Sequence, residues 1–306
     1  SPGLYGGYEY LPSEMNKRKD VKLKDKHNEA LLLMPRIFTE QADFNATVSD
    51  LSWGNYSYVS DLSFMSEYPK INYKHLKGKY SGKFSKEVIG DKITTSLGNC
   101  ITRNLFFVSM FREVPCILRP VIYYKGTYFD GEQTDDINAI LDWLSEFHYF
   151  KEITDFSSEK SSFICLSNEV THSNEKISHY NIIAPKSMSH LDSNAYDINT
   201  IVLYYLANWF NHLRNNNVYN NTKIIIVSDH ATSNGKISDI GFDKTIYTKN
   251  RHKDEIHPIL LVKDFNAKGP VKTDMTFMSN ADVPTLAFKD VVNNPTNPFT
   301  GKIINN

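Results

Sequence analysis

The feature that most constrains the fold is an uninterrupted aliphatic run, Ile224 to Val227, which is followed at once by Ser228, Asp229 and His230. Such runs are typical of strands in parallel sheets that helices cover on both faces. A helical pattern precedes the run, because apolar residues recur at helical spacing between about Asp197 and Asn215. A helix followed by a buried strand favours an α/β fold, in which ligands bind at the carboxyl ends of the strands.

The same alternation extends along the chain and predicts a three-layer α/β/α sandwich with a mostly parallel central sheet. Pro35 should kink the helix in which it lies or mark its start. We expect a single domain over residues 1–306, with an irregular lead-in at 1–26 and a long loop region at 51–95. The remaining expected elements are helices near 27–40, 101–111, 136–150 and 281–291, strands near 44–48, 162–167 and 259–262, and a short strand or extended connection at 121–124.

Composition removes several functional classes. Lys and Arg number 34 against 35 Asp and Glu, so the chain lacks the basic balance of a general nucleic-acid binder. The three cysteines are widely spaced without a CxxC pair, which indicates neither a cysteine zinc site nor a disulfide framework. The motifs GxGxxG, GxxxxGK[ST], GxSxG and HExxH are absent, so dinucleotide, P-loop, α/β-hydrolase and zincin sites lose support. No stretch approaches the ~18 apolar residues of a membrane span.

Asp229 and His230 are the strongest candidate site residues. A carboxylate and an imidazole on adjacent residues, at the point where a strand ends, can bind one divalent cation such as Zn²⁺ or Mn²⁺. The alternative is structural: Asp229 caps the following turn, and His230 is a partly exposed polar residue. The position directly after a buried strand favours the metal site.

Other candidates follow other predicted elements. Thr171 and His172 come after the strand near 162–167, and His172 could donate to a phosphoryl or sulfuryl oxygen or, alternatively, be a loop histidine bonded to the backbone. Trp53 could stack on a polyol or sugar and Asn55 hydrogen-bond to it, although a buried aromatic residue is an equal alternative. His257 precedes the strand at 259–262 and ranks lower, because we place it at the amino end, away from the cleft.

Residues 218–230, preceded by the helix at 196–214, resemble the sulfatase domain of the alkaline-phosphatase superfamily, in particular the lipoteichoic-acid-synthase-like membrane sulfatases of bacteria. The family pattern is N-T-x-I-I-x-x-S-D-H-G. Ser228, Asp229 and His230 match it, and Ala231 stands where Gly is usual. Further stretches that resemble these proteins are residues 4–10, 32–38, 280–286 and 297–302.

The resemblance implies one divalent metal ion, with Mn as the first choice and Zn, Mg or Ca as alternatives. In the family, an Asp-His pair, an upstream acidic residue and a Thr nucleophile hold this ion, and here Asp229 and His230 supply the pair. A His that contacts the substrate corresponds to Thr171-His172, and a substrate-contacting Trp corresponds to Trp53. The His and Arg that accompany this Trp have no counterpart, so a glycerol-phosphate substrate is not specified. The nucleophile and the acidic ligand are expected upstream of Ser1.

The resemblance therefore implies a metal-dependent hydrolase or transferase of phosphoryl or sulfuryl esters. Its anionic substrate would belong to a cell-envelope polymer, a lipid head group or a sulfated glycan, at the extracytoplasmic face of the bacterial cell membrane. Membrane attachment would come from segments absent from this chain, and we expect the chain as given to be inactive. The alternative is a non-catalytic domain of a larger membrane protein that binds an envelope glycopolymer.

Overall fold

The computed structural model resolves two compact units, each assembled from segments that lie far apart in the sequence. The first comprises residues 1–74, 156–167 and 213–306, and the second comprises 75–155 and 168–212. One domain can contain two compact units, so the single-domain expectation stays a prediction. The structure describes residues 2–58, 60–84, 87, 105–106, 108–120, 134–154, 156–172, 194–231 and 258–304.

The beginning of the chain is helical, so the expected irregular lead-in is wrong. Residues 2–15 form α1 (Pro2–Gly6), η1 (Tyr8–Tyr10) and α2 (Pro12–Met15). Each is too short to show a helical period, and Gly7, with a φ of 73°, separates the first two. Tyr10 is fully buried, and a Cβ added at Gly6 would collide with its ring. Burial of this tyrosine therefore orders a segment without a sequence period.

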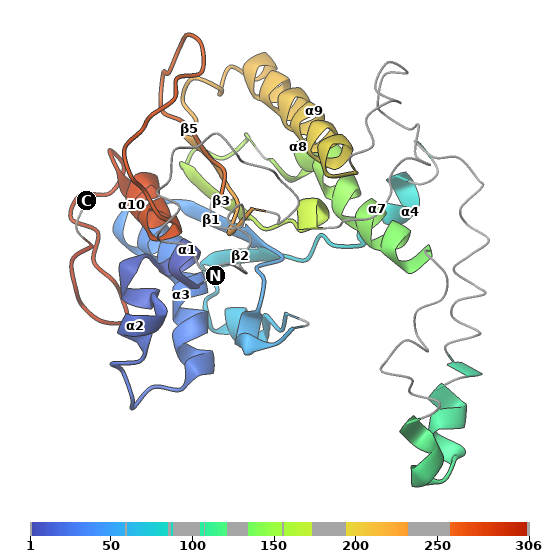
Figure 1. The fold of residues 1–306 in the computed structure, drawn as a ribbon. Helices are drawn as coiled ribbons and strands as arrows, with labels where there is room; N and C mark the ends of the chain where they lie inside the picture. The colour runs from blue at the N-terminus through green and yellow to red at the C-terminus, as the bar shows by residue number, and fades with distance from the viewer. Residues whose placement is uncertain are drawn as a thin grey trace, which may run out of the picture. The chain divides into compact units, whose positions relative to one another are not determined.

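The predicted helix near 27–40 is confirmed as α3 (Leu23–Gln41). Pro35 lies inside it and marks no helix start, although it has no N–H to donate to the preceding turn. The hydroxyl of Thr39 donates to the carbonyl oxygen of Pro35 at 2.9 Å. Most apolar side chains of α3 are buried, and the helix packs against β1 and β2 (Figure 1).

A three-stranded parallel sheet lies in the first unit, with the order β2-β1-β3. The strands β1 (Asn45–Ser49) and β3 (Ser162–Leu166) confirm two predictions, whereas β2 (Ile71–Lys74) falls in the region expected to be loop. Val48 pairs with Tyr73 on one side and with Cys165 on the other. The described residues therefore show a mixed α/β fold with parallel strands.

The strands β4 (Ile224–Val227) and β5 (Leu260–Lys263) are also confirmed, but they form a separate antiparallel pair. An apolar run does not indicate strand direction, so the sequence could not distinguish this arrangement from a parallel one. The expected burial of these strands is also wrong, since β4 is only partly buried and Leu261 and Val262 of β5 are exposed. Ile225 packs against the same core as Phe38 and Phe288. The expected helix near 281–291 is shorter than predicted, as η12 (Asn280–Asp282) and α10 (Val283–Phe288).

Helices dominate the described part of the second unit. The predicted helices near 136–150 and 197–215 are confirmed as α7 (Thr134–His148) and α9 (Asn194–Asn215). Residues 105–106 and 108–113 are helical, which confirms part of the expected helix at 101–111 and extends it by two residues. Residues 121–124 lie outside the described part. None of the described helices has the length and apolarity needed to cross a membrane.

The remaining elements of both units are short. They are η2 (Gly54–Tyr56), η3 (Ser63–Glu67), α4 (Ser81–Phe84), η6 (Cys116–Leu118), α8 (Phe150–Ile153) and η8 (Val170–His172).

Candidate functional site

Asp229 and His230 lie close together directly after β4. Oδ1 of Asp229 is 3.7 Å from Nε2 of His230, and each side chain is 51% exposed. Nδ1 of His230 lies 2.9 Å from the carbonyl oxygen of Ala231. A hydrogen bond from Nδ1–H to this carbonyl fixes the tautomer and leaves a lone pair on Nε2, the nitrogen near the carboxylate.

This spacing suits a shared cation. Bonds of about 2.1 Å place two ligands of one tetrahedral ion roughly 3.4 Å apart. The observed 3.7 Å between the Asp229 and His230 atoms is close to that separation. If His230 is protonated, the same two groups form an ion pair instead. Within the described ranges, no group of three or more His, Cys, Asp and Glu residues is placed to hold a metal, and Asp229 and His230 form a group of two.

The segment that begins at Ser279 holds the loop after β4. Nδ2 of Asn280 donates to the carbonyl oxygen of Asp229 at 2.7 Å. The Ser279 hydroxyl accepts from the N–H of Ala281, and the Asp282 carboxylate accepts from the N–H of Ser279, which together form a capping box. The loop thus rests on a well-defined helix start.

The first residues of the chain reach the same segment. The hydroxyl of Tyr8 donates to Oδ1 of Asp282 at 2.9 Å. α1 also packs against η12, to which Asn280 belongs. α1 and the Asp229 loop therefore share η12 as a neighbour.

Thr171 and His172 lie in η8, which belongs to the second unit. Oδ1 of Asn168 accepts from the N–H of Val170 at 3.0 Å, and the N–H of His172 donates to the carbonyl oxygen of Glu169 at 2.9 Å. Both candidate side chains are exposed. Asp229 and His230 belong to the first unit, so the convergence of His172 with them stays a prediction.

The loop after β1 contains an accumulation of left-handed backbone conformations. The φ values are 48° at Asp50, 66° at Trp53, 55° at Asn55 and 54° at Tyr56. Asp and Asn tolerate this region, but Trp and Tyr rarely adopt it. Such strain persists only where surrounding contacts impose it, and it is concentrated at functional sites.

Asn28 on α3 imposes the loop conformation through Asn55. Nδ2 of Asn28 donates to Oδ1 of Asn55 at 2.8 Å, and the N–H of Asn55 donates to Oδ1 of Asn28 at 2.9 Å. Nδ2 of Asn55 donates to Oδ2 of Asp61 at 2.8 Å. Hydrogen bonds lower the pKa of the Asp61 carboxyl: the one from the Ser63 N–H has the largest effect, and the one from the Asn55 side chain adds to it. Asn55 therefore holds the loop, and its role toward a substrate stays a prediction.

Three aromatic rings lie at the surface of this loop. Trp53 is 44% exposed, Tyr56 50% and Tyr58 87%, which removes the alternative of a buried Trp53. The Trp53 ring centroid lies 6.1 Å from that of Tyr56 and 5.9 Å from that of Tyr58. Aromatic rings with exposed faces on a braced loop can stack against the apolar face of a sugar. We call Trp53, Tyr56 and Tyr58 the aromatic loop.

Sequence reasoning missed Asp50, although the signal that singles out Asp229, an Asp directly after a buried strand, was present. Asp50 is 8% exposed and accepts a hydrogen bond from the Ser49 hydroxyl at 2.6 Å. Burial, and then the charge of Asp50, raise the pKa of Tyr73 on the neighbouring strand. The Ser52 and Ser167 hydroxyl oxygens are 3.3 Å apart, so the loops after β1 and β3 begin side by side at the carboxyl edge.

His27 on α3 packs beneath the aromatic loop. Its side chain is 3% exposed, and its ring meets that of Tyr56 edge-on at 5.6 Å. Burial lowers the pKa of His27, and the backbone of Ser52 opposes this shift, although neither ring nitrogen makes a hydrogen bond of ordinary geometry. The interior therefore favours a neutral His27.

The lowered pKa of His27 predicts that the first unit is destabilised by acid. His27 takes up a proton near pH 6.5 in the unfolded chain, but only at lower pH in the folded chain. The contribution of neutral His27 to the free energy of unfolding is therefore fully present above pH 6.5 and decreases as the pH falls toward the folded pKa. His27→Phe keeps a ring against Tyr56 and should reduce the loss of stability between about pH 7.5 and about pH 5, measured by urea unfolding together with amide hydrogen exchange on peptides of the first unit. An unchanged loss would contradict the prediction.

The antiparallel pairing of β4 with β5 removes the reason for ranking His257 low. The amino end of β5 lies beside the carboxyl end of β4, because the N–H of Ser228 donates to the carbonyl oxygen of Ile259 at 3.1 Å. The reason for ranking His257 low, a position at the opposite edge, is therefore wrong. His257 itself lies outside the described residues.

Comparisons with models of protein families, with curated proteins and with solved structures gave no match. The assignment of an activity therefore rests on the residues and contacts of this chain. The two clusters that carry it are the Asp229-His230 pair after β4 and the aromatic loop after β1.

Proposed function

We propose that this chain is part of a metal-dependent hydrolase or transferase of phosphoryl or sulfuryl esters, with a sulfatase-like three-layer sandwich fold. The observation that carries the proposal is the pairing of Asp229 with Nε2 of His230 at 3.7 Å, while Nδ1 of His230 is bonded to the Ala231 carbonyl. Backbone carbonyls orient metal-binding histidines in this way in many proteins. The motif at 228–230 and the parallel strands β1, β2 and β3 support the same assignment.

The two residues would hold one divalent cation, for which Mn²⁺ is our first choice. When bound, such an ion offsets the negative charge of a phosphoryl or sulfuryl group under attack. The nucleophile and a further acidic ligand would come from residues upstream of Ser1, and α1 lies against the segment that braces the Asp229 loop. Without those groups the chain should bind metal weakly and turn over little substrate.

The aromatic loop would contact the organic part of the ester. Trp53, Tyr56 and Tyr58 are exposed, and Asn55 lies between Trp53 and Tyr56 in the sequence. Stacking on a sugar or polyol fits an envelope polymer or a sulfated glycan better than a simple lipid chain. His172 would donate a hydrogen bond to the anionic group of the ester.

A non-catalytic binder of envelope glycopolymers is the second candidate function. It is supported by the aromatic loop, whose three exposed residues can bind a glycopolymer without a metal ion. In that case the aromatic loop would retain its ligand while the metal site would be vestigial. Metal affinity distinguishes the two functions.

The test is Mn²⁺ binding to the full chain, measured by titration calorimetry. Asp229→Ala should weaken the affinity for Mn²⁺ at least tenfold, because it removes the carboxylate and leaves the imidazole of His230 as the remaining ligand of the pair. Asp274→Ala is the matched control, since Asp274 also lies in an exposed loop and should leave the affinity unchanged. In a chain extended upstream to the proposed nucleophile, Asp229→Ala should abolish cleavage of a nitrophenyl phosphate or sulfate. Equal Mn²⁺ affinity in both variants would refute the metal site.

A further inference from the structure

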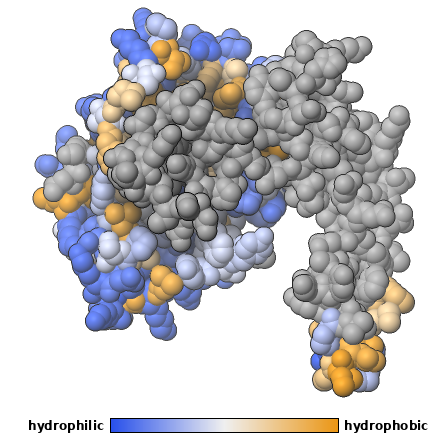
Figure 2. Space-filling view, in the orientation of Figure 1, coloured by the Kyte–Doolittle hydropathy of each residue, from blue (hydrophilic) through white to orange (hydrophobic). Residues whose placement is uncertain are grey.

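An apolar part of the second unit has its side chains at the surface. Leu105 is 63% exposed, Phe106 60%, Met110 38%, Ile117 84% and Leu118 49%. None of the described residues in 105–120 is buried. Figure 2 shows hydrophobic side chains gathered where Figure 1 draws this segment. We call residues 105–106 and 108–120 the apolar segment.

Local contacts of Arg119 hold the apolar segment in shape. Nε and Nη2 of Arg119 donate to the carbonyl oxygens of Val114 and Arg112, both at 3.4 Å, at the end of the helix through residue 113. The guanidinium also lies over the Phe111 ring, 5.6 Å from its centroid. The turn Cys116–Leu118 follows Pro115, to which the N–H of Leu118 donates at 2.9 Å. These contacts leave the side chains of Ile117 and Leu118 largely exposed.

The exposed apolar surface is large for such a short segment. Five apolar residues within 14 positions each expose between 38% and 84% of their surface. Monomers rarely expose contiguous apolar patches larger than a few hundred Å², and the largest patch of a monomer is often functional. Water contact with so much apolar surface is unfavourable, so we expect a partner to cover it.

Charge and composition favour a lipid surface over a folded protein. Arg112 and Arg119 outnumber the one acid of the segment, Glu113, whereas the whole chain carries a formal charge of −1. Leu, Phe, Met and Ile beside arginine are typical of segments that lie in a membrane interface. A stable protein interface instead needs about 800 Å² on each partner with a hydrogen-bonding rim. Between residues 105 and 120, Ser109 is the only residue with a hydroxyl side chain, so the segment offers few groups for a hydrogen-bonding rim.

We propose that the apolar segment inserts its side chains into the headgroup region of a bilayer that contains anionic phospholipid. Leu105, Met110, Ile117 and Leu118 enter the boundary with the acyl chains, and Arg112 meets the lipid phosphates. This inference does not depend on the proposed chemistry at Asp229. It places the chain on a membrane through its own residues, in addition to any segment outside it.

The test is co-sedimentation of the full chain with vesicles of phosphatidylglycerol and phosphatidylcholine. We expect binding that weakens in phosphatidylcholine alone, and at least a tenfold lower partition coefficient for Ile117→Asp combined with Leu118→Asp. The matched control is Val271→Asp with Phe277→Asp, since both residues are 92% exposed but lie in the first unit. The control should retain binding. No binding by the unaltered chain, or equal loss in both double variants, would overturn the proposal.

A second measurement covers the case in which the aspartate variant fails to fold. Cys116 is exposed within the apolar segment, whereas Cys165 is only partly accessible and its burial raises its pKa to about 12, so Cys116 should react first. In a Cys100→Ser background, an environment-sensitive fluorophore on Cys116 should shift to the blue when anionic vesicles are added. An unshifted spectrum would overturn the proposal. So would a dimer in light scattering that the aspartate pair dissociates, because a second copy would then cover the segment.

Discussion

Replacing Phe38 with Ala should lower the free energy of unfolding of the first unit by about 3–5 kcal/mol. The Phe38 side chain is 4% exposed, and its ring stacks on that of Phe163 with centroids 4.3 Å apart and an interplanar angle of 12°. Phe44 and Phe288 lie at centroid distances of 5.3 and 5.5 Å. Removing the ring opens a cavity where α3, β3 and α10 meet, and these elements cannot all close around it.

Amide hydrogen exchange followed by mass spectrometry measures this loss, on peptides that cover β1 and β3. Exchange resolves the first unit separately, whereas a single denaturation curve can merge the transitions of two units. Phe277→Ala is the matched control, because that side chain is 92% exposed and its removal should change stability by less than about 0.5 kcal/mol. Phe38→Leu should cost less than Phe38→Ala because more of the volume remains. A loss below about 1 kcal/mol for Phe38→Ala would mean that the core repacks fully.

Long elements with a strong period could be predicted from the sequence. α3, α7 and α9 each span several turns, so their apolar positions repeat often enough to reveal the period. Short elements could not be predicted in this way. β2 has four residues, of which only Ile71 is buried, and it is defined by its pairing with β1, which lies elsewhere in the sequence. The direction of β5 is set by a similar long-range contact.

The same distinction between local and long-range contacts applies to the candidate site. Asp229 and His230 are neighbours in the chain, so their proximity could be inferred from sequence, and the structure adds which nitrogen faces the carboxylate. The shape of the aromatic loop could not be inferred, because it depends on the pairing of Asn55 with Asn28, 27 positions away. Nothing local indicates that Trp53 and Tyr56 adopt left-handed conformations, which the surrounding network imposes on them.

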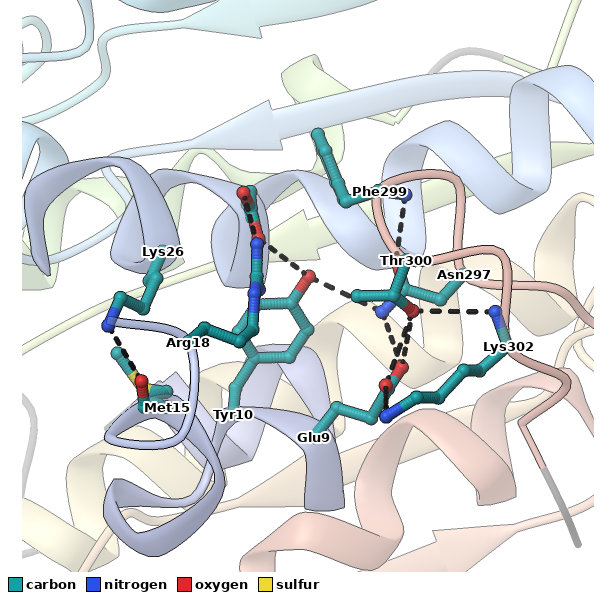
Figure 3. A network of polar contacts seen from close by, with 10 residues as sticks. Glu9, Tyr10, Met15, Arg18, Lys26, Asn297, Phe299, Thr300 and Lys302 are labelled. Atoms are coloured by element: carbon teal, nitrogen blue, oxygen red, sulfur yellow. Dashed lines mark hydrogen bonds and ion pairs between the residues drawn. The ribbon is translucent and has the colours of Figure 1, made fainter. Parts of the chain in front are cut away.

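The C-terminal strap, residues 296–303, is fastened to the start of the chain by a buried amide (Figure 3). Asn297 is fully buried, and its Nδ2 donates to Oε2 of Glu9 at 2.7 Å. Its Oδ1 accepts from the N–H of Phe299 at 2.9 Å. The hydroxyl of Thr300 donates to the same Glu9 oxygen at 3.0 Å. Lys302 pairs with Glu9 at 3.0 Å, but its side chain is 69% exposed, so water screens that contribution.

Asn297→Ala should therefore cost about 2–4 kcal/mol, because it removes a donor to a carboxylate and leaves the Phe299 N–H without its acceptor. Asn297→Asp keeps that acceptor but sets a second carboxylate against Glu9, so it should be at least as damaging at pH 7. Adding Glu9→Gln should then restore much of the loss, since the new amide can donate to the introduced carboxylate. Urea unfolding together with exchange of the strap amides measures all three variants. Asn293→Ala, at an exposed position four residues earlier, should be nearly neutral. If Asn297→Asp destabilised the strap equally with and without Glu9→Gln, the Glu9 contact would have no part in fastening it.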